Sequence, residues 1–121
     1  MVKPIKEVLA YRNKNILYRF NMMHEVPEEE ALQIYEDMLR FLWLYATYDE
    51  RRSKGEDVPD VLISGAMMII DQMWHSFILY TEHYEQFCNL YLGRFIHHPP
   101  IIHRFYKRVE EFDEEVATEK M

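Results

Sequence analysis

Apolar residues recur at every third or fourth position along this chain, and this spacing constrains the fold more than any other feature. A helix brings positions with that spacing onto one face. The chain has only 3 glycines, and no Asn-Gly or Asp-Gly pair separates alternating apolar runs, so the usual signals for β-hairpins are absent. The sequence therefore predicts an all-α fold, a bundle of four to five helices.

Start and stop signals divide the apolar pattern into separate helices. Pro27, followed by three glutamates that suit the positive end of a helix dipole, marks the clearest start. Thr81 is suited to cap another helix, and Gly93 is suited to end it. Pro99 and Pro100 exclude a helix from the turn that follows. The expected helices cover residues 5–23, 27–46, 67–80, 81–93 and 102–116.

The length of 121 residues leaves room for one ordinary domain. With 49% apolar residues, the chain can bury a core without disulfides. We therefore predict a single helical domain over residues 1–121, with frayed ends at 1–6 and 117–121. The charged segment Asp49–Asp60 is expected to be a solvated loop within that domain.

The acidic balance of the chain argues against nucleic acid as a partner. The formal net charge is -7 at pH 7, and a field of that sign repels phosphate backbones. Residues 1–20 are an exception, because they contain five basic side chains and one acidic one. We expect this basic segment to lie beside the acidic residues 110–115 rather than to bind a nucleic acid.

Neither a membrane location nor secretion is predicted. The most apolar stretch, Val61–Tyr80, has Asp71 near its middle, and a central aspartate costs about 2.5 to 3.5 kcal/mol on insertion scales. We interpret the stretch as a buried helix with an irregular approach. A single cysteine, Cys88, cannot form an intramolecular disulfide, and the first residues lack an apolar targeting segment. The cytoplasm is the expected compartment.

Residues that commonly bind metals gather in the second half of the chain. Five of the six histidines and the only cysteine lie between His75 and His103. Imidazole nitrogen and thiolate sulfur are ligands for zinc and iron. If the neighbouring helices pack together, the turn after Gly93 brings its histidines back beside them. The candidate ligands are His75, Cys88, His97 and His98.

Other interpretations of the same residues stay open. Cys88 lies on an apolar stripe and suits a buried position as a small hydrophobic residue. His75 suits a core histidine bonded to a carbonyl or to Asp71, which lies one turn earlier. The alternative to a metal site is therefore a metal-free module with a buried His, Asp and Cys network that binds a protein partner. A Cys-His enzyme is a third hypothesis. No catalytic residue is identified, because the spacings that define known catalytic metal motifs are absent.

One stretch of the sequence resembles a known family. Its residues are Ile70-Asp71-Gln72-Met73-Trp74-His75-Ser76-Phe77-Ile78-Leu79, then Tyr84, Phe87-Cys88 and Gly93-Arg94-Phe95-Ile96-His97-His98-Pro99. They resemble small bacterial proteins of unknown function that are similar to the conserved region of plant and fungal glycine-rich domain-containing proteins. The glycine-rich segment is missing here, so RNA contacts associated with it do not carry over. The resemblance implies that the Asp, Trp-His, Cys and His residues belong together.

These observations lead to one site hypothesis. We predict a transition-metal site, with zinc favoured over iron, held by the four candidate ligands. Asp71, Trp74 and Tyr84 are predicted to orient those ligands. A site closed by protein ligands would be structural, whereas a position open to water would permit hydrolytic or redox chemistry.

Overall fold

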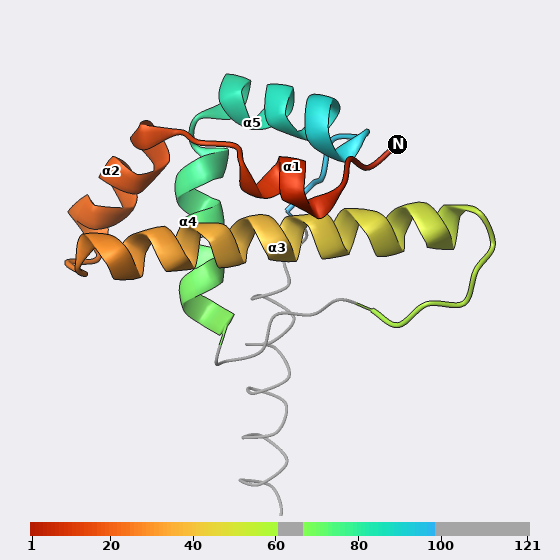
Figure 1. Cartoon of the computed structure of the whole chain (residues 1–121), viewed down its shortest axis with the longest axis horizontal. Helices are drawn as coiled ribbons and strands as arrows, with labels where there is room; N and C mark the ends of the chain where they lie inside the picture. Colours follow the sequence, from red (N-terminus) through yellow and green to blue (C-terminus); the bar gives the residue numbers. More distant parts are fainter. Residues whose placement is uncertain (61–66, 99–121) are drawn as a thin grey trace, which may run out of the picture.

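The computed structural model describes residues 1–60 and 67–98, and this part of the chain forms helices with no strand (Figure 1). The all-α prediction is confirmed. The helix predicted over 102–116 lies outside the described residues, as do the acidic residues 110–115. The helices are α1 (Ile5–Leu9), α2 (Lys14–Met23), α3 (Glu28–Ser53), α4 (Met68–Ile78), α5 (Thr81–Phe87) and the single π-helical turn η2 (Cys88–Leu92).

The long helix α3 is the base on which α1, α2, α4 and η2 pack. It has 26 residues, with Pro27 just before it and three glutamates in its first turn. Its length exceeds the prediction, because the residues before Lys54 continue the helix into the segment expected to be a loop. Arg51 and Arg52 in the last turn favour this extension, since cations stabilise the negative end of the helix dipole. Its core-facing side chains are Ala31, Ile34, Tyr35, Met38, Leu39, Phe41, Leu42 and Ala46.

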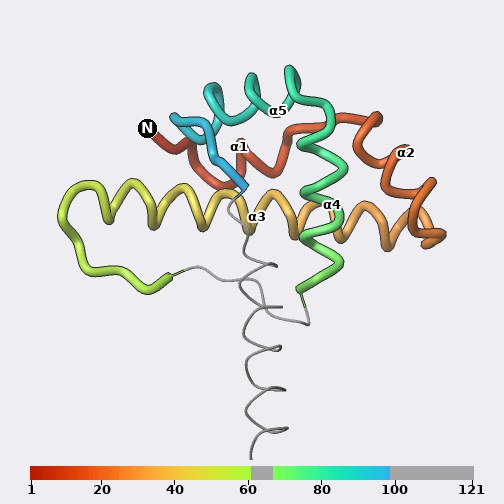
Figure 2. The backbone as a smooth tube through the Cα atoms, turned by 180° about the vertical axis from the view of Figure 1, so that it is seen from behind, coloured from red at the N-terminus to blue at the C-terminus, as the bar shows by residue number. Residues whose placement is uncertain are grey.

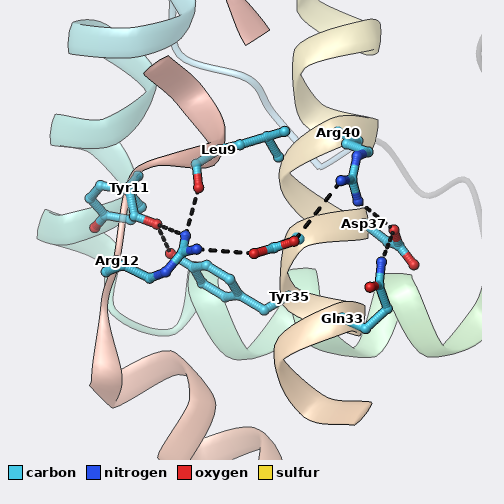
Figure 3. Close-up of polar contacts among 8 residues, drawn as sticks. Leu9, Tyr11, Arg12, Gln33, Tyr35, Asp37 and Arg40 are labelled. Atoms are coloured by element: carbon cyan, nitrogen blue, oxygen red, sulfur yellow. Dashed lines mark hydrogen bonds and ion pairs between the residues drawn. The ribbon is translucent and has the colours of Figure 1, made fainter. Parts of the chain in front are cut away.

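The single helix predicted over residues 5–23 is wrong, because the chain breaks it into α1 and α2. The Asn13 side chain caps α2 by accepting a hydrogen bond from the backbone N–H of Asn15 at 3.1 Å. The Tyr11 carbonyl, freed from helical bonding, accepts a hydrogen bond from the Tyr35 hydroxyl of α3 at 2.7 Å (Figure 3). The guanidinium of Arg12, in the same break between α1 and α2, forms an ion pair with Glu36 of α3 at 3.0 Å.

The helix α4 crosses α3 steeply and is the element that carries the candidate site (Figures 1 and 2). It contacts α2 and α5 as well as α3. Four of its five buried residues, Met73, Trp74, Ser76 and Phe77, have apolar or small side chains, and the fifth is Asp71. Among the described helices, none combines the length and the apolar content that a bilayer span requires.

A tight turn at Gly93 sends the chain from η2 back toward α4. Gly93 has a φ of 77°, and a Cβ added there would lie 2.4 Å from the backbone nitrogen of Met1. Both facts require glycine, as the sequence predicted. Residues 94–98 then form no helix, and Ile96 is buried with 2% of its surface exposed. This segment directs His98 toward α4 and leaves His97 exposed.

The first residues of the chain have partners in the helical core. The backbone N–H of Val2 donates to Glu50 Oε2 at 3.1 Å, and that of Lys3 donates to the Tyr91 carbonyl at 2.9 Å. The Trp43 indole donates to the Lys3 carbonyl at 3.0 Å. These hydrogen bonds hold Val2 and Lys3 against the core. The predicted fraying of residues 1–6 stays a prediction.

Candidate metal centre

Asp71 is a fully buried carboxylate with an imidazole beside each of its oxygens. Its side chain has no solvent-exposed surface. Oδ1 accepts a hydrogen bond from His98 Nε2 at 2.8 Å, and Oδ2 lies 3.1 Å from His75 Nε2. Because Asp71 and His75 are four residues apart on α4, they share one face of that helix. His98 reaches the same point from the segment after Gly93.

The two oxygens of Asp71 are not equally satisfied. Oδ2 is buried and has no hydrogen-bond donor among the described residues, although it lies within ion-pair distance of His75 Nε2. A buried acceptor without a donor costs about 1–3 kcal/mol. Such an oxygen is expected to bind a cation or a proton, and the nearest imidazole nitrogen to it is His75 Nε2.

The three side chains are close enough to share one ion. One ligand atom from each of Asp71, His75 and His98 lies within 4.8 Å of the others. Around a tetrahedral zinc, ligand atoms at about 2.0–2.1 Å from the metal are separated by about 3.3 Å. The ligand atoms of this group are therefore more widely spaced than those around a bound zinc, by up to about 1.5 Å. The site is open on one side, since 46% of the His75 side chain is exposed, against 16% for His98.

Trp74 contacts this group directly, and Tyr84 is bonded to Trp74. The Trp74 ring packs against the His98 ring, with centroids 4.0 Å apart. Its indole N–H donates to the Tyr84 hydroxyl at 3.1 Å, and that hydroxyl donates to the Ile96 carbonyl. Burial raises the pKa of Tyr84 well above its usual value, so the side chain remains a neutral phenol.

Cys88 and His97, two of the four candidate ligands, lie outside the group of Asp71, His75 and His98. Cys88 is fully buried in the hydrophobic core. Burial raises the pKa of its thiol, while contacts with the Ile96 backbone and Tyr84 act in the opposite direction. His97 is exposed, and its ring meets the edge of Phe95. The structure therefore pairs two predicted ligands with Asp71, which was predicted only to orient them.

The sequence does contain a signal that Asp71 belongs to this group. It is the only formally charged residue in an apolar stretch of twenty, and it lies one helical turn before His75. Such a carboxylate must find a cationic or hydrogen-bonding partner when its helix is buried. The choice between His97 and His98 had no such signal, because adjacent residues in an extended segment point to opposite sides.

Comparisons with curated proteins and with solved structures found no match. A family model does match residues 24–108, which is more than half of the chain. The matched range includes Asp71, His75 and His98 together with Trp74 and Tyr84. By this match, the chain belongs to the UCP032817-like family.

Proposed function

We propose that this protein binds one divalent transition-metal ion through Asp71, His75 and His98. One observation carries the proposal: a fully buried carboxylate has an imidazole Nε2 near each oxygen, and one of those oxygens lacks a hydrogen-bond donor among the described residues. Buried charges in proteins are paired or coordinate metals. Two imidazoles beside one carboxylate form a ligand set of the kind that zinc and non-haem iron use.

Zinc is the ion that we favour over iron. Three protein ligands and one water complete a tetrahedral zinc site. Iron with the same ligands would need up to three further positions filled by water or substrate. A carboxylate and two imidazoles also satisfy the borderline character of zinc without the thiolate of Cys88, which is buried and lies outside the group.

The exposure of His75 determines what the ion would do. A water molecule bound on the open side would have a lowered pKa and would act as a nucleophile near neutral pH. Binding would also connect α4 with the segment after Gly93, because His98 belongs to that segment. Metal binding would therefore stabilise the fold.

The alternative is a metal-free module that binds a protein partner. It is supported by exposed apolar residues on α2, where Tyr18, Met22 and Met23 expose 66% to 68% of their surfaces. A groove of about 650 Å³ lies between α2 and the start of α3, beside Tyr18.

Calorimetric titration with zinc distinguishes the two functions. The variant His98→Ala removes a proposed ligand, and His97→Ala is its matched control, since the neighbouring histidine is exposed. We expect one zinc per chain for the natural sequence and for His97→Ala, and an affinity at least about 100-fold weaker for His98→Ala. No zinc binding by the natural sequence, or equal losses in both variants, would remove the metal function and favour the metal-free module.

A further inference from the structure

The hydroxyl of Tyr84 connects two groups that both determine where His98 lies. One is the indole of Trp74, whose ring packs against the His98 ring. The other is the carbonyl of Ile96, two residues before His98 in the extended segment. We propose that Tyr84 is a positioning residue that holds His98 against Asp71. The inference concerns the same site as the proposed metal function and rests on it for its consequence in metal binding.

The direction of every hydrogen bond in this network follows from its chemistry. The Trp74 indole can only donate, so the Tyr84 oxygen accepts that bond. A carbonyl can only accept, so the single proton of the Tyr84 hydroxyl points to Ile96. Burial keeps this phenol protonated. A hydroxyl, which donates and accepts at once, therefore fits between these two groups, and the Cys88 thiol contacts it as well.

The network restricts His98 in two independent ways. Holding the Ile96 carbonyl restrains the backbone from which His98 extends toward Asp71. Holding the indole restrains the ring that covers one face of the imidazole. With both in place, His98 Nε2 meets Asp71 Oδ1 at 2.8 Å. Loss of the hydroxyl would release both restraints together.

The ring of Tyr84 is held separately from its hydroxyl. It packs edge-on against Phe77 and Phe95, with centroids 5.0 and 5.4 Å away. The variant Tyr84→Phe therefore retains the packing and removes only the hydroxyl. Its matched control is Tyr35→Phe. Tyr35 is also buried, and its hydroxyl also donates to a backbone carbonyl, that of Tyr11 (Figure 3). Tyr35 belongs to α3 and is far from the site residues in the sequence.

The first test is the affinity for zinc. We expect Tyr84→Phe to bind zinc about 10–100-fold more weakly than the natural sequence, and Tyr35→Phe to bind it with unchanged affinity. A double-mutant cycle shows whether Tyr84 acts through His98: in the His98→Ala background, Tyr84→Phe should cause no further loss. The same loss in both backgrounds would overturn the positioning role.

The second test needs no metal and separates this inference from the proposed function. In nitrogen-15 NMR of the zinc-free protein, we expect His98 to carry its proton on Nε2, bonded to Asp71. Tyr84→Phe should shift the His98 ring nitrogens toward tautomer averaging, and Tyr35→Phe should not. If the natural sequence binds no zinc but this shift occurs, the metal function fails and the positioning role stands. Unchanged His98 signals in Tyr84→Phe would overturn the positioning role.

Discussion

The substitution Asp71→Asn tests the proposed metal centre with almost no change of shape. Asparagine retains one oxygen that can accept the hydrogen bond from His98, so the metal-free protein should lose only the difference between a charge-assisted and a neutral hydrogen bond, about 1 kcal/mol. Zinc binding should suffer far more, because the anionic ligand between the two imidazoles is gone. We expect its affinity to fall by at least about 100-fold.

The size of the effect on thermal stability follows from this loss of affinity. At a zinc concentration 100 times the Kd, binding stabilises the natural sequence by about 2.7 kcal/mol. A 100-fold weaker variant at the same concentration gains about 0.4 kcal/mol. For a chain of this length, roughly 4 °C of Tm corresponds to each kcal/mol. Zinc should therefore raise the Tm by about 10 °C in the natural sequence and by about 2 °C in Asp71→Asn.

Differential scanning calorimetry with and without zinc measures both shifts. The matched control is Asp49→Asn, because Asp49 forms a partly exposed ion pair with Arg94 at 3.0 Å. Such a pair contributes about 0–1 kcal/mol, and its loss should leave the zinc shift at about 10 °C. An equal zinc shift in Asp71→Asn and in the natural sequence would refute the assignment of Asp71 as a ligand.

Three further predictions test other parts of the structure. Cys88→Ala should retain the affinity for zinc. It should lower the free energy of unfolding, measured in urea, by about 1–2 kcal/mol, because the thiol is buried in the core. Loss of zinc binding in this variant would show that Cys88 is a ligand. Burial raises the pKa of Cys88 from the ordinary 9.0, so the contribution of the neutral thiol to stability should decline as the pH rises above that value. Above pH 9 the free energy of unfolding should therefore fall less steeply with pH in Cys88→Ala than in the natural sequence. Equal slopes in the two proteins would contradict this prediction. Gly93→Ala should lower the free energy of unfolding by at least about 1–2 kcal/mol, because of the positive φ and the close approach of Met1. An unchanged urea midpoint would contradict the claim that the turn requires glycine.

The periodic spacing predicted the helices because apolar residues three and four positions apart form one helix face, and that face is buried against the core. Val8, Ile16 and Phe20 are buried as expected from one apolar face. The break before Asn13 was not predictable in this way, because it depends on Tyr35 of α3 bonding the Tyr11 carbonyl from 24 residues away. The extension of α3 beyond Asp49 was also not predictable from the sequence, because charged residues suit a solvated helix end as well as a loop.

The candidate site was predictable in part. Asp71 and His75 are one helical turn apart, so their proximity follows from α4 alone. Which residues join them depends on how the chain returns after Gly93, and this return brings His98 inward while His97 faces solvent. Cys88 is buried in the core, which agrees with its apolar stripe, and it also contacts Tyr84 and the Ile96 backbone. The resemblance to glycine-rich domain-containing proteins, the cytoplasmic location and the lack of nucleic-acid partners stay predictions.

Anomalous diffraction at the zinc absorption edge, from a crystal of the protein grown with zinc, would show whether Asp71, His75 and His98 hold the ion. We predict an anomalous peak about 2.0–2.2 Å from the Asp71 carboxylate and from Nε2 of both His75 and His98. A peak bonded to Cys88 instead, or a zinc-soaked crystal with no peak beside Asp71, would contradict this prediction.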